Sequence, residues 1–366
     1  MAISALVDRT LAAIAPLDDA AMAAARARQD TLTKPLGSLG KLEELAVRLA
    51  GIFADPLPSI GRKCLILAAG DHGVVAEGVS AYPQEVTPQM VHNFLSGGAA
   101  INVLARHVGA EIVIIDAGVA ADLEPHPLLR SAKIGRGTAN MAVGPAMSRQ
   151  QAVQCLETGI QAAQEQIDAG AALIACGDMG IGNTTASSAI TAVITGTDPE
   201  MTTGRGTGLE DSALVHKVQV IRRAIQCNQA EPSDGLDVLT KLGGYEIGVL
   251  SGIMLGVAAG RRPVLVDGFI SGAAALIAWR LCPLAVSYFI AAHRSVEPGH
   301  DVGLEAMGLS PLLNLEMRLG EGTGAALAMP LVEAAAKCLV EMATFTQAGV
   351  SERDEDGNDS GTPGAS

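Results

Sequence analysis

The segment ALIACGDMGIGNTTASSAI (172–190) contains an apolar run, a loop with three glycines and a run of small residues, in direct succession. The apolar run predicts a buried strand, and residues 183–185 open a predicted helix. Glycines let backbone N–H groups face a ligand, and the helix N-terminus adds positive partial charge. The segment therefore predicts a phosphate-binding loop between a strand and a helix. The alternative is a turn that needs glycine only for steric reasons.

Two familiar nucleotide-binding motifs do not fit this loop. A Walker loop ends in Gly-Lys-Ser or Gly-Lys-Thr, and this one does not. Thr185 stands where a dinucleotide-binding fingerprint has its third glycine. The loop is therefore interpreted as a phosphate cradle of another kind.

Four further apolar runs have the same character and end in glycine or small residues. Helical patterns lie between the runs, and the clearest spans 148–169, with a capping box of Ser148 and Gln151 and a stop at Gly170. Strands that alternate with helices imply a Rossmann-like, doubly wound α/β fold with a parallel sheet and ligands at the carboxyl ends of the strands. The four runs are 64–70, 111–118, 263–268 and 285–292.

The two ends of the chain are helical in pattern and bracket the strand-rich middle. We expect residues 1–60 and 325–347 to form a smaller helical domain, and residues 61–324 to form the large α/β domain that binds the substrate. The tail 348–366 loses apolar periodicity, so we expect it to be disordered.

Composition excludes several classes of partner. A formal net charge of −14 argues against nucleic acid and anionic membranes, because both need a concentrated basic surface. The apolar stretch 269–292 is interrupted by Arg280 and Pro283, which favours a helix, a turn and a buried strand over a membrane span. The six cysteines include no CxxC pair, as expected for free thiols in a cytoplasmic protein.

No metal site is predicted. The seven histidines show no HxH, HxxxH or HExxH spacing. Asp71 and His72 follow the first predicted strand, and we interpret them as a hydrogen-bonded pair at its end.

Glu321 is the candidate catalytic base. It lies between glycines in MRLGEGTGAALAM (317–329), where its neighbours are uncharged and small. A carboxylate that loses its water there has a raised pKa and becomes an effective general base. The alternative is a glutamate that caps the following helix.

Two other segments carry candidate ligand-binding residues. In TTGRGTGLEDSALVHK (202–217), glycines that include Gly208 surround Arg205 and precede a helix with Lys217, which suits a phosphate or ribose; an exposed turn is the alternative. The stretch 77–107 resembles a long loop that leads into a helix, and it either lines a pocket or only connects. Its candidate pocket residues are Ser80, Tyr82 and Gln89.

Six segments together resemble the nicotinate-nucleotide:dimethylbenzimidazole phosphoribosyltransferases. The resemblance covers nearly the whole chain up to about residue 347 and rests on the order of all six, since no single one is specific. The segments are TKPLGSLGKLEELA (33–46), DHGVVAEGVSAYPQEVTPQMV (71–91), IVIIDAGV (112–119), ACGDMGIGNTTASSA (175–189), GRGTGL (204–209) and RLGEGTGAALA (318–328).

The resemblance implies a cytoplasmic homodimer of cobalamin biosynthesis that needs neither metal nor cofactor. Its reaction is pentosyl transfer: a nitrogen of 5,6-dimethylbenzimidazole attacks the anomeric carbon of nicotinate mononucleotide, which gives α-ribazole 5′-phosphate and nicotinate. The nicotinate ring nitrogen is cationic while attached, so it leaves without a general acid. The enzyme must supply a base, a slot for the flat ring, and donors for the phosphate.

The resemblance also implies roles for individual residues. Glu321 removes the benzimidazole proton, and Asp178 and Asp267 support it. Glutamate is common in the family where this chain has Asp178, and the shorter carboxylate reaches less far. The base pocket is expected to include Ser80, Tyr82, Gln89, Met179 and Leu319. Phosphate and ribose are expected to be held by Gly180, Ile181, Gly182, Asn183, Thr184, Gly206, Lys217 and Ser295.

Two other classes of protein stay open from the sequence. A non-catalytic protein that binds nucleotides or anions would use the same loops, and Glu321 would then only cap a helix. A nucleoside phosphorylase or hydrolase would split the nucleotide without a benzimidazole. Within the transferase interpretation, adaptable Met and Leu side chains do not select among benzimidazoles, purines and phenols.

Overall fold

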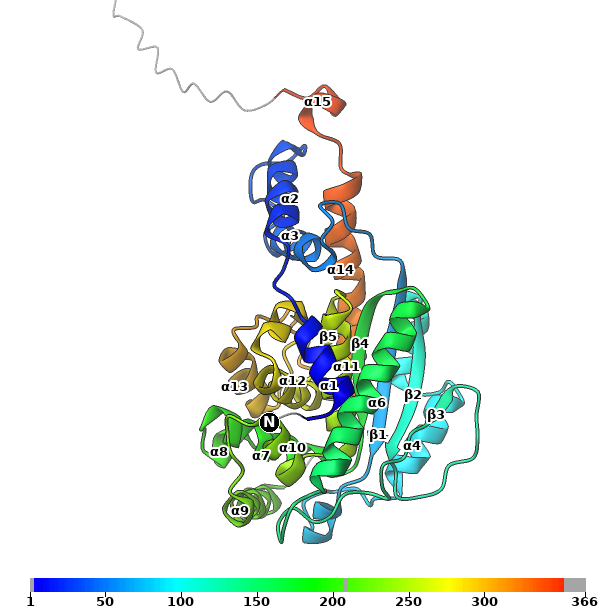
Figure 1. The fold of residues 1–366 in the computed structure, drawn as a ribbon, viewed down its shortest axis with the longest axis vertical. Helices are drawn as coiled ribbons and strands as arrows, with labels where there is room; N and C mark the ends of the chain where they lie inside the picture. Colours follow the sequence, from blue (N-terminus) through cyan, green and yellow to red (C-terminus); the bar gives the residue numbers. More distant parts are fainter. Residues whose placement is uncertain (1–2, 207–209, 352–366) are drawn as a thin grey trace, which may run out of the picture.

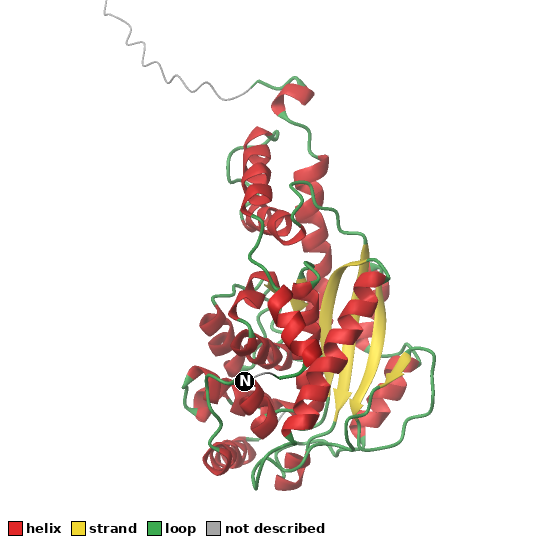
Figure 2. Ribbon diagram, viewed as in Figure 1, coloured by secondary structure: helices red, strands yellow, loops and turns green. Residues whose placement is uncertain are grey.

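The computed structural model describes residues 3–206 and 210–351. Its six strands form one sheet in which every pair is parallel, in the order β3-β2-β1-β4-β5-β6 (Figures 1 and 2). This is the strand order of doubly wound dinucleotide-binding folds, so the predicted α/β fold class is confirmed. The strands are β1 (Arg62–Gly70), β2 (Ala110–Gly118), β3 (Leu129–Ser131), β4 (Ala171–Met179), β5 (Val264–Val266) and β6 (Phe289–Ala291).

The prediction of a strand over 285–292 is wrong in its first half. Pro283–Tyr288 forms a 3₁₀ helix, η2, and only the next three residues join the sheet. Proline suits the first turn of a helix, because its φ is fixed there and its missing N–H is not needed. The apolar pattern also does not predict β3, a three-residue edge strand that pairs with β2 alone.

Side chains of β1 alternate between two cores, one on each face of the sheet. Cys64, Ile66 and Ala68 belong to one core, whereas Leu65 and Leu67 belong to the other. Helices that contribute to the first core are α1 (Ala5–Ala13), α6 (Arg149–Asp168), α7 (Asn183–Thr195), α9 (Asp211–Asn228), α10 (Gly235–Leu242), α11 (Tyr245–Ala259) and α12 (Phe269–Leu281). Those of the second core are α2 (Asp19–Thr31), α3 (Lys41–Phe53), α4 (Val86–Leu95), α5 (Ala100–Val108) and α14 (Thr323–Glu341).

Helix α6 has the caps that the sequence predicts. The Ser148 side chain accepts from the Gln151 N–H, the Gln151 side chain accepts from the Ser148 N–H, and Gly170 follows with a φ of +89°. The helix packs closely on α11, because a methyl group on Gly252 would lie 2.2 Å from the carbonyl oxygen of Leu156. Some glycines of this chain therefore serve contact between helices, not ligand binding.

Helices α2 and α3, which follow α1, pack beside α14 above the sheet (Figure 1). Helices α2 and α3 contact α14, and Arg28 of α2 donates to the carbonyls of Leu339 (2.7 Å) and Val340 (3.0 Å). Helix α1 instead contacts α6 and α11 in the larger part of the molecule. The predicted domain boundaries stay a prediction. The short helix α15 (Phe345–Ala348) follows α14, and residues 352–366 of the predicted tail lie outside the described residues.

Helix α14 is, within residues 3–206 and 210–351, the one helix that is long and apolar enough to cross a membrane by length and composition. In this fold 56% of its apolar window is buried inside the protein, and core helices pass the same test. Its first turn lies at the sheet and its last turns lie against α2 and α3. The remaining elements are η1 (Gly73–Glu77), α8 (Pro199–Thr202) and α13 (Pro298–Met307).

Candidate active site

A cavity of about 820 Å³ opens at the carboxyl ends of β4, β5 and β6. Doubly wound sheets bind their ligands outside the carboxyl ends of their strands. Residues from six segments line it: Tyr82, Val86, Met90, Asp178, Met179, Gly180, Ile181, Asn183, Thr184, Gly206, Gly268, Phe269, Ile270, His293, Ser295, Glu297, Met317, Arg318, Leu319, Gly320 and Glu321.

The predicted phosphate loop connects β4 to α7 at one wall of the cavity. Gly182 has a φ of +94°, which favours glycine, and it stands directly before the first residue of α7. The Ile181 N–H donates to Thr87 Oγ1 (3.1 Å), so α4 holds the loop from outside. The N-terminus of α7 therefore faces the region that Asn183 and Thr184 line, where an anion is favoured.

Glu321 lies in a turn of three residues with left-handed backbone. Gly320, Glu321 and Gly322 have φ values of +83°, +62° and +89°. Positive φ is strained for a glutamate, and such strain concentrates at functional sites. The Glu321 side chain is 5% exposed, and its Oε2 accepts from the Ile101 N–H (3.3 Å). Burial raises the pKa of this carboxyl group, and that hydrogen bond opposes the rise.

Asp267, and not Glu321, accepts the N–H groups at the start of α14. Its carboxylate binds the N–H groups of Gly322 (3.2 Å) and Ala325 (2.7 Å). Burial raises the pKa of Asp267 to about 7, although these hydrogen bonds lower it. Asp267 thus fixes the turn that presents Glu321, and it does not itself line the cavity.

Asp178 lies at the end of β4, on the cavity wall. Its Oδ2 accepts from Asn183 Nδ2 (3.1 Å), which joins the carboxylate to the first residue of α7. Burial raises the pKa of Asp178, and the negative charges of Asp267, Glu246 and Glu321 raise it further. A carboxyl group in this setting favours the protonated form, because neighbouring carboxylates repel its charge.

Gly177 of β4 lies directly under the Glu321 turn. A methyl group there would lie 2.4 Å from the carbonyl oxygen of Glu321. We expect Gly177→Ala to lower the free energy of unfolding by about 1–3 kcal/mol, because overpacking forces the backbone apart. Urea unfolding measures the change. Gly144→Ala is the matched control, since a methyl group there meets no atom within 4 Å; an equal loss in both variants would contradict the explanation.

Lys217 reaches the cavity wall from α9. Its Nζ donates to Thr184 Oγ1 (2.8 Å), and the side chain is 1% exposed. Burial lowers the pKa of the ammonium group to about 8, although Glu297 raises it. Lys217 thus joins two segments that the sequence separately predicts to bind phosphate. Gly208, which belongs to the same predicted ligand-binding segment, lies outside the described residues.

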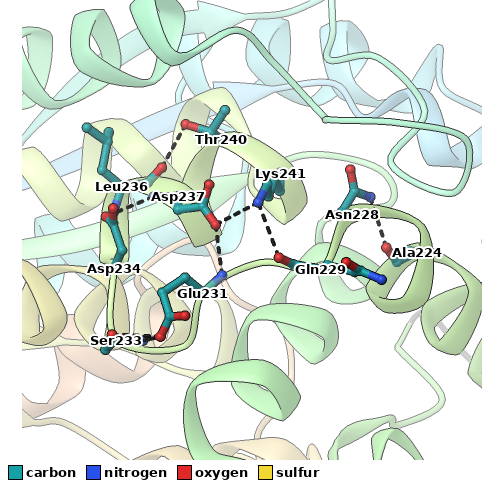
Figure 3. A network of polar contacts seen from close by, with 10 residues as sticks. All are labelled: Ala224, Asn228, Gln229, Glu231, Ser233, Asp234, Leu236, Asp237, Thr240 and Lys241. Atoms are coloured by element: carbon teal, nitrogen blue, oxygen red, sulfur yellow. Dashed lines mark hydrogen bonds and ion pairs between the residues drawn. The ribbon is translucent and has the colours of Figure 1, made fainter.

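The end of α9 is tied to α10 by the network in Figure 3. Lys241 Nζ donates to the Gln229 carbonyl (3.2 Å) and to Asp237 Oδ2 (2.9 Å), and the same Oδ2 accepts from the Glu231 N–H (2.8 Å). These contacts fix the C-terminal end of α9, the helix that carries Lys217.

Another part of the cavity wall is apolar. Val86 and Met90 of α4 line it together with the predicted residues Tyr82, Met179 and Leu319. Tyr82 and Leu319 are 51% and 57% exposed, so apolar surface is open to a flat ring at this wall.

Four predicted residues, in addition to Asp267, do not line the cavity. Ser80 Oγ donates to the Tyr82 carbonyl (3.0 Å) and accepts from its N–H, so Ser80 forms the turn that carries Tyr82. Gln89 is exposed on α4. Gly182 and Lys217 lie behind residues that do line it.

The sequence interpretation missed three polar residues in the cavity wall. His293 and Glu297 follow β6 on either side of the predicted Ser295, and Arg318 precedes Leu319. The rule that ligands meet the carboxyl ends of strands would have selected the two that follow β6. His72 also differs from its predicted pairing: its Nε2 contacts Glu246 Oε1 (2.6 Å) of α11, while Asp71 Oδ2 accepts from the Ala120 N–H. Among the described residues, no group of three His, Cys, Asp or Glu is arranged to hold a metal ion.

The chain is similar to proteins of known function over nearly its full length. The family model described as phosphoribosyltransferase matches residues 14–350. A nicotinate-nucleotide–dimethylbenzimidazole phosphoribosyltransferase of Roseiflexus sp. (strain RS-1) is 59% identical over 96% of this chain and 99% of its own length. The protein of that name from Desulforamulus reducens (strain ATCC BAA-1160 / DSM 100696 / MI-1) is 56% identical over 95% and 99%.

Solved structures agree with these sequence matches. The crystal structure of CobT from Thermus thermophilus has a TM-score of 0.89 and 49% identity, and the match covers 91% of this chain and all of that one. The chain therefore belongs to the phosphoribosyltransferase family of the nicotinate-nucleotide–dimethylbenzimidazole phosphoribosyltransferases.

Proposed function

We propose that the protein transfers the 5-phosphoribosyl group of nicotinate mononucleotide to 5,6-dimethylbenzimidazole, a step of cobalamin lower-ligand assembly. The observation that carries this proposal is one cavity with two unlike walls: a glycine-rich helix N-terminus beside Lys217, and an apolar wall beside the buried Glu321. An anionic nucleotide suits the first wall and a flat, apolar base suits the second.

The reaction needs one proton acceptor. A benzimidazole nitrogen forms a bond to the anomeric carbon as the bond from that carbon to the pyridine nitrogen breaks. The electron pair of the broken bond neutralises the pyridinium, so nicotinate leaves without a proton. The unprotonated ring nitrogen attacks, and the proton on the second ring nitrogen passes to Glu321, whose raised pKa suits a general base.

The phosphate and ribose side is assigned to the loop before α7. The Ile181 and Asn183 N–H groups are hydrogen-bonded to Thr87 Oγ1 and the Gly180 carbonyl and shape the loop. The N–H groups of Gly180 and Gly182, the Thr184 hydroxyl and the Lys217 ammonium hold the 5′-phosphate, and Gly206 and Ser295 face the ribose. Fixing the nucleotide there leaves its anomeric carbon towards the apolar wall, where the base binds. Tyr82, Met179 and Leu319 form the slot for that base, and Ser80 and Gln89 support it.

Asp178 is assigned a supporting role, because it is joined to Asn183 and its environment favours the protonated form. We expect Asp178→Ala to lower kcat by about tenfold, as loss of one buried hydrogen bond does. Steady-state rates of nicotinate release measure this. A larger loss in this variant than in Glu321→Gln would show that the two roles are inverted.

The test of the transferase is nicotinate release from the mononucleotide, measured with and without 5,6-dimethylbenzimidazole. We expect release only with the base present, and formation of α-ribazole 5′-phosphate in equal amount. Equal release without the base would establish a hydrolase. No release under either condition would favour a binding protein without catalysis.

We further propose that the enzyme is a cytoplasmic homodimer. All six cysteines are free thiols, which supports a reducing compartment. The homodimer is what the resemblance to the phosphoribosyltransferase family implies. Sedimentation equilibrium at micromolar concentration tests the dimer, and a monomer mass would contradict it. Activity recovered in the membrane or secreted fraction would contradict the compartment.

A further inference from the structure

Glu297 occupies the N-cap position of α13 but does not cap that helix. Its carboxylate turns instead towards the Gly204–Gly206 segment, on the cavity wall. The side chain is 6% exposed, and its Oε2 has no hydrogen-bond partner among the described residues. Burying a carboxylate with an unpaired oxygen costs free energy, because burial disfavours its charge. We therefore ask what this side chain does at the cavity.

The side chains of Arg318 and Glu297 act on Gly206. Arg318 Nη1 donates to the Gly206 carbonyl (3.0 Å), and the Gly206 N–H is among the groups that lower the pKa of the Glu297 carboxyl group. Gly206 has a φ of +53°, a conformation that glycine adopts readily and that other residues rarely adopt. At Gly204, a methyl group would lie 1.9 Å from Glu297 Oε2, so the carboxylate packs directly on that backbone.

This segment stands beside the ammonium group of Lys217. A methyl group on Gly206 would lie 3.1 Å from Thr184 Oγ1 and 3.3 Å from Lys217 Nζ, the two groups assigned to the phosphate. Burial raises the pKa of Glu297, and the charges of Lys217 and Arg318 oppose that rise, so the three groups act on one another. Two cations and one carboxylate leave a net positive charge for an incoming dianion.

We propose that Glu297 and Arg318 are positioning residues that clamp Gly206, and that this clamp completes the phosphate site opposite α7. The carboxylate and the guanidinium hold the segment against Lys217 and Thr184. Neither group needs to touch the phosphate. The inference rests on the proposed function, because that function places the 5′-phosphate at this wall.

The test compares two ligands that differ only in the phosphate: nicotinate mononucleotide and nicotinate riboside. Calorimetry gives Kd for each with the unmodified protein, Glu297→Ala and Glu297→Gln. We expect Glu297→Ala to weaken mononucleotide binding by about 10–100-fold and riboside binding by less than about threefold, as loss of a hydrogen bond to a charged group does. Glu297→Gln keeps an oxygen that accepts the Gly206 N–H, so it should recover most of the affinity. Arg318→Ala should repeat the selective loss.

Three outcomes would overturn the clamp. Equal losses for both ligands would indicate general structural damage, and thermal unfolding of each variant would show the same. A Gln variant as weak as the Ala variant would assign Glu297 a role through its charge, not through the Gly206 N–H. An unmodified protein that binds both ligands equally would contradict the phosphate assignment of the proposed function, and the inference with it.

Discussion

Glu321→Gln is expected to lower kcat by about 10²–10⁴-fold and to leave the affinity for nicotinate mononucleotide nearly unchanged. Glutamine has the shape of glutamate and can still accept the Ile101 N–H, but it cannot take a proton from the benzimidazole. The loss should therefore appear in the chemical step and not in nucleotide binding. Single-turnover release of nicotinate and calorimetric binding of the mononucleotide separate the two.

Glu316→Gln is the matched control for this variant. Glu316 lies in the same segment and also has positive φ (+55°), but its side chain is exposed and does not line the cavity. We expect it to retain full activity. The acid side of the pH profile adds a second check, because only ionised Glu321 accepts a proton. Activity should fall as pH drops through the raised pKa of Glu321, and the residual activity of Glu321→Gln should lack that fall. A near-normal rate in Glu321→Gln would exclude it as the base.

Local sequence patterns predict much of this fold because several elements carry their own signals. The loop of 172–190 places its strand, its glycines and its helix N-terminus within one short segment, and the structure shows all three in place. The capping box of α6 and the stop at Gly170 are equally local. Such elements do not depend on residues far along the chain.

The parts that sequence does not predict depend on distant contacts. In the sequence, Glu297 is a glutamate before a proline and carries no signal of burial. In the fold, its carboxylate packs against the Gly204–Gly206 segment. Glu246, the partner of His72, lies 174 residues further along the chain, whereas Asp71 is its neighbour in sequence. The sequence therefore predicts the wrong partner. The 3₁₀ turn before β6 is as apolar as a strand. Burial of a charge is a property of the packed molecule, and no pattern of neighbours reports it.

Lys217→Ala is expected to lower kcat/KM for the mononucleotide by about 30–1,000-fold, the usual cost of removing one partner of a buried charge pair. The reason is that Lys217 Nζ is the buried ammonium beside Thr184, where the proposed function places the phosphate. The riboside should lose far less, because it has no phosphate to lose. Lys337→Ala is the control, since that lysine is 56% exposed and ion-paired only on the surface of α14. Equal losses for the two substrates would contradict a phosphate contact.

The pH dependence of this lysine gives a sharper result, because its pKa is lowered to about 8 in the free protein. Only the ammonium form attracts the phosphate, so kcat/KM should fall as pH rises through about 8, where the free protein loses that proton. Arginine stays charged throughout this range, so kcat/KM of Lys217→Arg should show no such fall. At neutral pH this variant should have a lower kcat/KM than the unmodified protein, because the planar guanidinium fits the site less well. kcat should fall less than kcat/KM in the unmodified protein, since bound phosphate favours the ammonium and raises its pKa. An alkaline fall that persists in Lys217→Arg would assign the titration to another group and would remove Lys217 from the phosphate site.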